Sequence, residues 1–212
     1  MIIAVDGPTA SGKGTIAKAL AAHFGLPHLD TGLLYRAVGW QVAQNGGDPD
    51  NATDALDACA FDDALLCNPE LRSEATGGLA SRVSVHPDVR RALYERQRVF
   101  ATQPGGAVLD GRDIGTVIAP EAEVKLYVTA TTQARAERRW REMAGREMAG
   151  RGGEVALEEI LAQLERRDAR DKGRDNAPLT IAEDAFVLDT TQLDKEAAIA
   201  AAIKVVEEVR FS

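Results

Sequence analysis

Short apolar runs alternate along this chain with longer stretches of helical periodicity. Each run is followed by a polar turn, a pattern typical of buried strands in a parallel sheet. The runs occupy residues 2–5, 26–29, 107–109, 124–128 and 185–188. The helical stretches between them lie at about residues 14–23, 33–44, 87–101, 132–149, 155–169 and 195–209. This order predicts an α/β fold, a doubly wound five-stranded parallel sheet with right-handed crossovers.

Two segments depart from the alternation. Residues 45–80 are rich in Gly, Asp and Asn and have only weak periodicity, so we interpret them as an excursion from the sheet. In residues 141–153 the sequence Arg-Glu-Met-Ala-Gly occurs twice in succession, which we interpret as a mobile surface flap between two helices. This duplication is far too short to be a solenoid unit, so it either lengthens a helix or enlarges a loop.

Length and composition indicate one globular domain. A chain of 212 residues can bury one good-sized core, and 45% hydrophobic and 27% charged residues lie near globular averages. No apolar run reaches the roughly 18 residues that a membrane helix needs. Two cysteines, Cys59 and Cys67, are too few for a disulfide framework. We therefore expect a cytoplasmic protein with inert thiols.

The charge distribution narrows the choice of partner. A net charge of -8 argues against nucleic acid or an anionic membrane, because these partners select a basic surface. Arginine nevertheless accounts for 19 of the 25 basic residues, and many arginines lie between residues 135 and 174. A small polyanion such as a nucleotide fits this concentration of guanidinium groups.

A glycine-rich loop after the first predicted strand is the sharpest chemical signal. It fits the Gly-x-x-x-x-Gly-Lys core of a phosphate-binding loop, in which backbone N–H groups converge on phosphate oxygens at a helix N-terminus. Lys13 would bridge the β- and γ-phosphates. Thr15, one place beyond the usual Ser/Thr position, would offer its hydroxyl to Mg²⁺ directly or through water. The loop consists of Gly7, Pro8, Thr9, Ala10, Ser11, Gly12, Lys13, Gly14 and Thr15.

Phosphate binding alone does not choose among the proteins that share such a loop. A GTPase needs a guanine-reading Asn-Lys-x-Asp run after a strand, and this sequence has none. A motor or a transporter ATPase is normally larger. The remaining class is a small kinase whose acceptor is held by the other arginines.

Further motifs accompany the loop along nearly the whole chain. They are Leu29-Asp30-Thr31-Gly32-Leu33-Leu34-Tyr35-Arg36, Asp110-Gly111-Arg112-Asp113-Ile114-Gly115-Thr116, Arg167-Asp168-Ala169-Arg170-Asp171, Ala177-Pro178-Leu179 and Leu188-Asp189-Thr190-Thr191. With them the chain resembles the bacterial cytidylate kinases, nucleoside monophosphate kinases with a phosphate loop. The resemblance implies a single kinase domain over residues 1–212. It also implies a shortened nucleoside-monophosphate-binding insertion at 45–86 and a lid at 138–155 that is about one repeat longer than expected.

The reaction implied by the resemblance is transfer of the γ-phosphoryl group of ATP to CMP or dCMP, a step of pyrimidine metabolism. Catalysis would rest on positioning and charge stabilisation with Mg²⁺, without a covalent intermediate. Lys13, Arg36, Arg112 and Arg167 match the catalytic set, and the three arginines would clamp the acceptor phosphate. The resemblance also implies a monomer whose partners are CMP, dCMP and ATP. The matching substrate-binding positions are Thr31, Arg36, Ser81, Arg90, Arg112, Asp113, Arg167, Asp171 and Arg174.

Base and sugar recognition are divided among members of this set. Ser81, Arg90 and Asp113 match family positions around cytosine, and Asp113 can accept a hydrogen bond from the exocyclic amine. Asp171 matches the position that contacts the ribose, and Arg174 a position near the base or phosphate. Such polar contacts reject a wrong base strongly, because a mismatch leaves buried groups unpaired.

Each assignment has a structural alternative. Arg90 could lie on a solvated helix face, and Arg167 and Asp171 could form an ordinary i,i+4 ion pair. Thr31 could cap the helix that follows it. Asp110 could cap a turn or orient a magnesium-bound water. The histidines, which lack metal-ligand spacing and which we interpret as structural, are His23, His28 and His86.

Arginines concentrate in the predicted lid. In related kinases such a flap closes over ATP and excludes water. We expect at least one of its arginines to contact phosphates, although the repeated Arg-Glu pairs could equally be surface ion pairs of a helix. The lid arginines are Arg138, Arg139, Arg141, Arg146 and Arg151.

Two other functions stay open. One is a kinase of the same fold that acts on UMP, AMP or a metabolite such as shikimate. The set of Ser81, Arg90 and Asp113 disfavours an acceptor that is not a nucleotide. The other is a non-catalytic nucleotide-binding regulator, which the intact Lys13 and Arg112 disfavour, because a pure binder can lose the clamp on the second phosphate.

Overall fold

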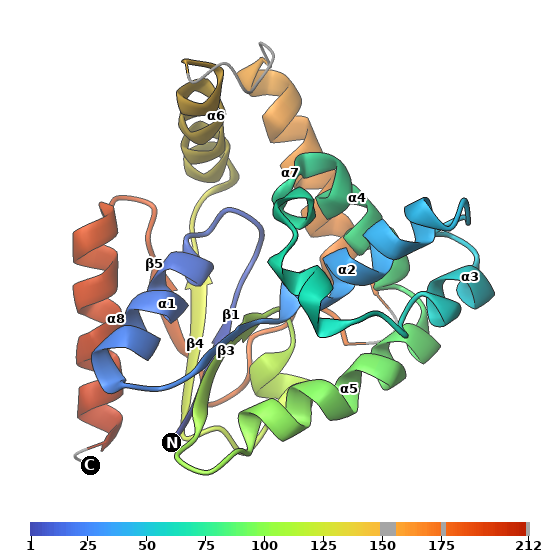
Figure 1. The fold of residues 1–212 in the computed structure, drawn as a ribbon. Helices are drawn as coiled ribbons and strands as arrows, with labels where there is room; N and C mark the ends of the chain where they lie inside the picture. Colours follow the sequence, from blue (N-terminus) through green and yellow to red (C-terminus); the bar gives the residue numbers. More distant parts are fainter. Residues whose placement is uncertain (149–155, 175–176, 211–212) are drawn as a thin grey trace.

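A parallel sheet of five strands forms the centre of the molecule (Figure 1). The computed structural model describes residues 1–148, 156–174 and 177–210. Its strands are β1 (Ile2–Asp6), β2 (His28–Asp30), β3 (Ala107–Gly111), β4 (Val124–Thr129) and β5 (Phe186–Asp189). All neighbouring pairs are parallel, in the order β2-β3-β1-β4-β5. The predicted α/β fold is confirmed.

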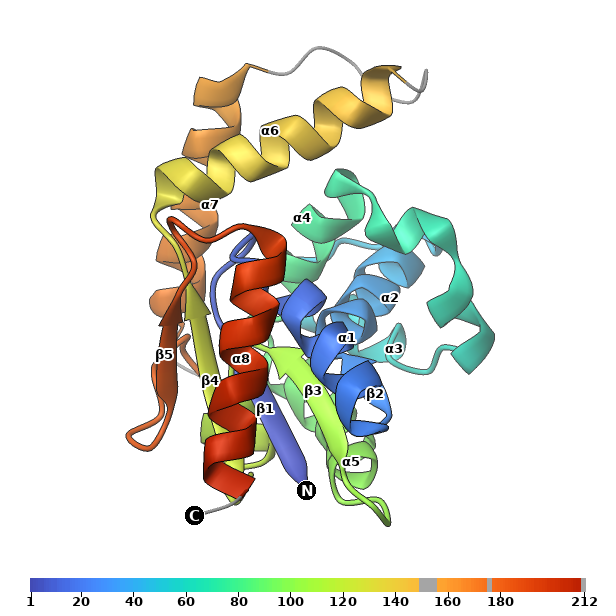
Figure 2. The ribbon, with the colours of Figure 1, turned by 90° about the vertical axis from the view of Figure 1, so that its left-hand side faces the viewer.

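Helices cover both faces of the sheet, and Figure 2 shows α8 in front of it. The helices of the described residues are α1 (Lys13–Phe24), α2 (Thr31–Gln44), α3 (Ala52–Asp57), α4 (Glu74–Val83), α5 (Pro87–Ala101), α6 (Thr132–Met148), α7 (Leu157–Lys172) and α8 (Lys195–Arg210). Of these, α1 and α8 pack on one face of the sheet and α5 on the other. Ile3 and Val5 pack with α1 and α8, whereas Ala4 and Leu109 pack with α5. Because successive side chains of a strand point to opposite faces, burial on both faces explains the unbroken apolar runs. No helix among the described residues is long and apolar enough to cross a membrane.

The strand order reverses beside β1, which lies between β3 and β4. In open α/β sheets, ligands bind in the crevice at the carboxyl ends of strands at such a point. The phosphate loop follows β1, and Arg112 and Asp113 follow β3. Since β1 and β3 pair in parallel with Asp6 opposite Gly111, two distant motifs leave the sheet side by side.

Asp6, the last residue of β1, ties these two motifs together. Its buried carboxylate accepts hydrogen bonds from the backbone N–H groups of Ile114 (2.9 Å) and Gly115 (2.8 Å). Both residues belong to η3 (Ile114–Ile118), a π-helical turn after β3. Burial raises the pKa of Asp6 to about 7, although the two backbone hydrogen bonds oppose that rise. The carboxylate thereby anchors the segment that follows Arg112 and Asp113.

The last strand differs from the prediction of a buried strand. β5 lies at the edge of the sheet and pairs with β4. Phe186 and Val187 are 43% and 56% exposed. An apolar run predicts a strand, but it does not reveal whether a second strand covers its outer edge.

Residues 45–86 are largely helical, which weak periodicity did not predict. Besides α3 and α4 they contain the 3-10 turns η1 (Asp63–Cys67) and η2 (Pro69–Arg72). Asn51 caps α3 through its side chain, and Ser73 caps α4 by accepting from the N–H of Thr76. Gly77 and Gly78 lie inside α4 and lower its helix propensity, which hides the helix in the sequence.

The predicted flap at 141–153 is partly helix. α6 continues through Met148, so residues 141–148 extend that helix instead of forming a loop. The first copy of the five-residue repeat therefore lengthens α6. The remainder of the predicted flap, residues 149–153, lies outside the described residues.

Gly39→Ala is expected to lower the free energy of unfolding by about 1–3 kcal/mol through overpacking. Gly39 lies where α2 meets α4, and an added Cβ would sit 2.8 Å from Cβ of Leu79 and 2.9 Å from its carbonyl carbon. Urea denaturation followed by circular dichroism measures the change.

Gly78→Ala is the matched control on the partner helix. Nothing lies within 4 Å of an added Cβ at Gly78, so helix propensity should stabilise this variant by up to ~1 kcal/mol. If both variants were equally stabilised, the close approach of α2 and α4 would be wrong.

Candidate active site

A cleft of about 420 Å³ opens at the carboxyl ends of β1 and β3. The phosphate loop and α1, the helices α2 and α4, and the end of α7 border it. The structure brings most of the sequence-predicted site residues together here. Those that line the cleft are Thr9, Ala10, Gly12, Lys13, Gly14, Thr15, Thr31, Arg36, Ser81, Arg90, Arg112, Asp113, Arg167, Asp171 and Arg174.

Three residues of the loop do not line the cleft, namely Gly7, Pro8 and Ser11. Space requires the glycine at Gly7, because a Cβ at its φ of +150° would lie 2.0 Å from the carbonyl oxygen of Val128. Ser11 is fully buried, and its Oγ has no hydrogen-bond partner among the described residues. Gly7 therefore allows the loop to pack closely against β4 and does not face the cleft.

The loop itself leaves polar groups without protein partners. Gly12, with φ of +90°, precedes α1, and no side chain caps that helix N-terminus. The ammonium of Lys13 makes no hydrogen bond or ion pair within the described part of the chain. Burial, and then repulsion from Arg112, lowers the pKa of Lys13 to about 8. Unpaired N–H groups and an unpaired ammonium fit a phosphate group.

Two arginines on the opposite side of the cleft also lack a carboxylate partner. Arg36 donates from Nη1 to the carbonyl oxygens of Leu71 and Ser73, each at 2.8 Å, and burial lowers its pKa. Arg167 makes no hydrogen bond or ion pair among the described residues. Burial, followed by repulsion from Arg112, lowers the pKa of Arg167 to about 10. Both guanidinium groups therefore have N–H donors that an anion in the cleft can accept from.

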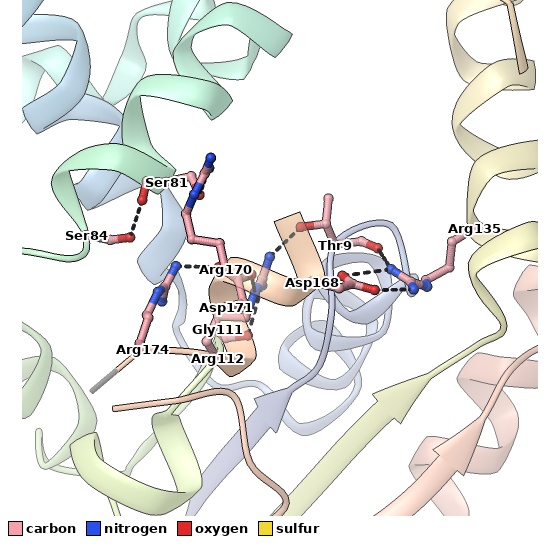
Figure 3. Close-up of polar contacts among 10 residues, drawn as sticks. All are labelled: Thr9, Ser81, Ser84, Gly111, Arg112, Arg135, Asp168, Arg170, Asp171 and Arg174. Carbon is pink, nitrogen blue, oxygen red and sulfur yellow. Dashed lines mark hydrogen bonds and ion pairs between the residues drawn. The ribbon is translucent and has the colours of Figure 1, made fainter. Parts of the chain in front are cut away.

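Asp171 gathers the other arginines near the end of α7 (Figure 3). Its carboxylate accepts from Nε of Arg112 at 2.8 Å and pairs with Arg174. Arg112 also donates from Nη2 to Oγ1 of Thr9 at 2.7 Å, which connects α7 to the phosphate loop. Burial opposes ionisation of Asp171, but Arg112 and Arg174 together hold its pKa below the ordinary value. The structural alternative, an i,i+4 ion pair between Arg167 and Asp171, is wrong, because Asp171 pairs with Arg112 and Arg174 instead.

Two further structural alternatives are wrong. Arg90 is not on a solvated face, because its side chain is 11% exposed and pairs with Asp113. Thr31 is itself the first residue of α2, and its hydroxyl donates to the carbonyl oxygen of Asp110 at 2.9 Å instead of capping the helix. Both side chains therefore belong to the cleft.

Asp110 faces the phosphate loop from β3. One carboxylate oxygen is 2.7 Å from Nε2 of His28, and the other lies 3.5 Å from the position of a Cβ on Gly14. His28 therefore contacts a carboxylate that lines the cleft, which its interpretation as a structural residue did not include. The contact forms because β2 pairs with β3. The hydroxyl of Thr15 and the carboxylate of Asp110 are oxygen ligands of the kind that Mg²⁺ prefers. Among the described residues, no group of three or more His, Cys, Asp or Glu residues is arranged for a metal, so substrate phosphates would have to supply further ligands.

The lid arginines have different partners. Arg138 and Arg139 line the cleft, and Arg138 also donates to Oγ1 of Thr190 at 3.0 Å. Arg139 pairs with Glu74, so it links α6 to α4. Arg141 forms an i,i+4 surface ion pair with Glu137 at 3.2 Å. The side chains of Arg146 and Arg151 lie outside the described part of the structure.

Sequence reasoning missed two arginines beside the site (Figure 3). Arg135, 3% exposed, donates to the carbonyl oxygen of Thr9 at 3.0 Å and pairs with Asp168 of α7. Arg170 donates to Oγ of Ser81 at 2.8 Å. Each contact joins segments far apart along the chain, so no local pattern could have predicted it.

The sheet is all-parallel, its central strand leads into a phosphate loop, and arginines line the cleft beside that loop. These features define the small P-loop kinases as the class of this protein. A family model described as cytidylate kinase matches residues 3–208. The chain thus belongs to the cytidylate kinase family and is a phosphotransferase.

Individual relatives agree with the family model. The cytidylate kinase of Caulobacter vibrioides (strain NA1000 / CB15N) is 53% identical over 211 residues, covering 99% of this chain and 96% of the relative. The cytidylate kinase of Cereibacter sphaeroides (strain ATCC 17023) is 55% identical over 205 residues, covering 97% and 94%. A crystal structure of an uncharacterized protein from Eubacterium ventriosum ATCC 27560 has a TM-score of 0.56 at 14% identity, with 98% of each chain covered. That structure supports the fold alone.

Binding of ATP is expected to take up protons above pH 8. Burial lowers the pKa of Lys13 from its ordinary value of 10.5 to about 8 in the free protein. A bound phosphate favours the ammonium form and raises this pKa again, so binding at higher pH must reprotonate the lysine. Isothermal titration calorimetry in two buffers of different ionisation enthalpy measures the uptake.

The uptake should be larger at about pH 8.5 than at pH 7, where Lys13 is already protonated in the free protein. Lys13→Met is the control and should lose the difference between buffers. Equal heats in both buffers at the higher pH would contradict the lowered pKa.

Proposed function

We propose a residue-level scheme by which this kinase transfers the γ-phosphoryl group of ATP to CMP or dCMP, giving ADP and CDP or dCDP. The observation that carries it is that Lys13 of α1, Arg36 of α2 and Arg167 of α7 meet around one cleft without a carboxylate partner among the described residues. Since partly buried cations without a counter-ion are unfavourable on their own, these three side chains support a site completed by phosphate groups.

The donor phosphates bind at the phosphate loop. Backbone N–H groups at the start of α1 hold them, and Lys13 bridges the β- and γ-phosphates. The hydroxyl of Thr15 and the carboxylate of Asp110 are the protein groups that would hold Mg²⁺, directly or through water. When bound, Mg²⁺ neutralises charge on the donor phosphates. His28 holds the carboxylate of Asp110 by the 2.7 Å contact described above.

The acceptor phosphate binds between Arg36, Arg112 and Arg167. Their guanidinium groups neutralise the charge of the attacking phosphate and orient it for in-line transfer. The first two come from α2 and from the segment after β3, and the third from α7. Catalysis in this scheme is positioning and electrostatic stabilisation, and no protein side chain becomes covalently bound.

The base and sugar bind at the far end of the cleft. Ser81, Arg90 and Asp113 contact cytosine, in a pocket where Arg90 and Asp113 already pair with each other. Asp171 contacts the ribose, with Arg174 beside it. Thr31 lines the acceptor side of the cleft and is fixed by its hydrogen bond to Asp110. A base without the cytosine pattern would leave these buried groups unpaired.

We also propose how the chain is organised around this reaction. Residues 45–86 form the acceptor-binding insertion and residues 138–155 the lid, within one kinase domain. The Arg139–Glu74 pair supports a lid that meets the insertion. The free cysteines and acidic charge support a cytoplasmic protein, and family membership favours a monomer.

A coupled assay of ADP release tests the acceptor. Mg²⁺–ATP is offered with CMP, dCMP, UMP, AMP and shikimate separately, and strong turnover is expected with CMP or dCMP only. Arg167→Ala should lower kcat/KM for CMP by roughly 100-fold or more, because an unpaired cation aimed at the reacting phosphate is lost. Lys13→Ala should abolish turnover.

Arg166→Ala is the matched control, since Arg166 is the exposed neighbour of Arg167 on the same helix. It should leave kcat/KM unchanged. A clear preference for UMP or AMP would refute the base assignments while preserving a kinase, and ATP binding without turnover of any acceptor would favour the regulator.

A further inference from the structure

Arg170 makes the contact between α7 and the helix that carries Ser81. In Figure 3 its side chain extends from α7 toward α4. Nη1 donates to Oγ of Ser81 at 2.8 Å. Arg170 is itself exposed, does not line the cleft, and makes no other side-chain hydrogen bond or ion pair within the described residues. Its polar contact is therefore directed at a single residue of the proposed base site.

The contact determines how the Ser81 hydroxyl is presented. A serine hydroxyl rotates freely, and in a helix it readily turns back to the carbonyl oxygen four residues earlier, here that of Gly77. A guanidinium group only donates, so Oγ of Ser81 must accept from Arg170. The hydroxyl proton and a second lone pair remain, with no protein partner among the described residues. Arg170 thus holds a nearly buried hydroxyl in the rotamer that faces the cleft.

The neighbouring residue of α7 connects this contact to the phosphate end. Asp171 holds Arg112 and Arg174, while Arg170 holds Ser81. Because these contacts arise from adjacent residues of one helix, the orientation of α7 sets the phosphate clamp and the base-facing hydroxyl together. Ser84 adds a second constraint on α4, since its hydroxyl donates to the carbonyl oxygen of Ser81 at 3.2 Å.

We propose that Arg170 is a specificity-determining positioning residue that acts through Ser81 to favour CMP over UMP. The inference rests on the proposed function, because it assumes that Ser81 faces the base. Arg170 touches neither the base nor the reacting phosphates. Its effect is to keep the Ser81 hydroxyl from rotating to its own helix, where it would no longer discriminate between the two pyrimidines.

The test is the ratio of kcat/KM for CMP to kcat/KM for UMP in the full chain. Arg170→Ala and Ser81→Ala are measured alone and combined, with Arg166→Ala as the matched control on the same exposed stretch of α7. Arg170→Lys is the conservative variant, since it retains a charged donor. Kinetics with ATP varied at saturating CMP report any effect on the donor site.

Arg170→Ala should lower the CMP/UMP ratio by about tenfold, the effect of losing one charged hydrogen bond. The loss should arise from kcat/KM for CMP, with KM for ATP unchanged. Arg170→Lys should retain part of the discrimination, and Arg166→Ala all of it. In the Ser81→Ala background, Arg170→Ala should change the ratio by less than about twofold, because the two residues act as one unit.

Equal losses for CMP and UMP in Arg170→Ala would overturn the inference, since they would indicate a phosphate or structural role. So would independent effects of the two substitutions in the double variant, or a change confined to KM for ATP. These outcomes are distinct from failure of the proposed function, in which the unsubstituted protein itself would not prefer CMP.

Discussion

Repulsion among cations that must share one cleft is the constraint on which this structure depends. Lys13 and Arg167 both have lowered pKa values, caused first by burial and then by the charge of Arg112. Without an anion, the protein can gather these groups only by holding some of them with carboxylates. Asp171 does this for Arg112 and Arg174, and Asp113 does it for Arg90. Lys13 and Arg167 form no ion pair among the described residues. The strand ends, the phosphate loop and α7 hold this charge arrangement in place, which suits a bound polyanion.

Helix α7 is the element that coordinates the arrangement. Three of its residues reach three different parts of the molecule: Asp168 pairs with Arg135 beside the phosphate loop, Asp171 holds Arg112 after β3, and Arg170 holds Ser81 of α4. A single turn of helix brings these side chains out in different directions. The phosphate loop, the segment after β3 and α4 are therefore all tied to one helix. This explains why the motif around Arg167 to Asp171 contains so many charged residues.

Local chemistry made much of this predictable. Apolar runs and helical periodicity locate the five strands and the main helices, because burial on both faces of a parallel sheet and on one face of a helix has a characteristic spacing. Where local signals conflict with packing, prediction fails. The sequence does not predict α4, because Gly77 and Gly78 lower its helix propensity. The helix forms because it packs closely against Gly39 of α2. The exposure of Val187 could not be predicted either, because an apolar strand looks the same at the edge of a sheet as at its centre.

The sequence by itself determined the phosphate-loop motif and the order of the strands and main helices, because each depends on near neighbours along the chain. It also supplied the candidate residues for phosphate and base recognition. Tertiary structure decided which charges pair. Asp171 pairs with Arg112, which follows β3, and not with Arg167 one turn away. His28 meets Asp110 only because β2 lies beside β3. Helical spacing permits an ion pair, but the pair that forms is the one that best compensates the loss of hydration when distant segments pack together.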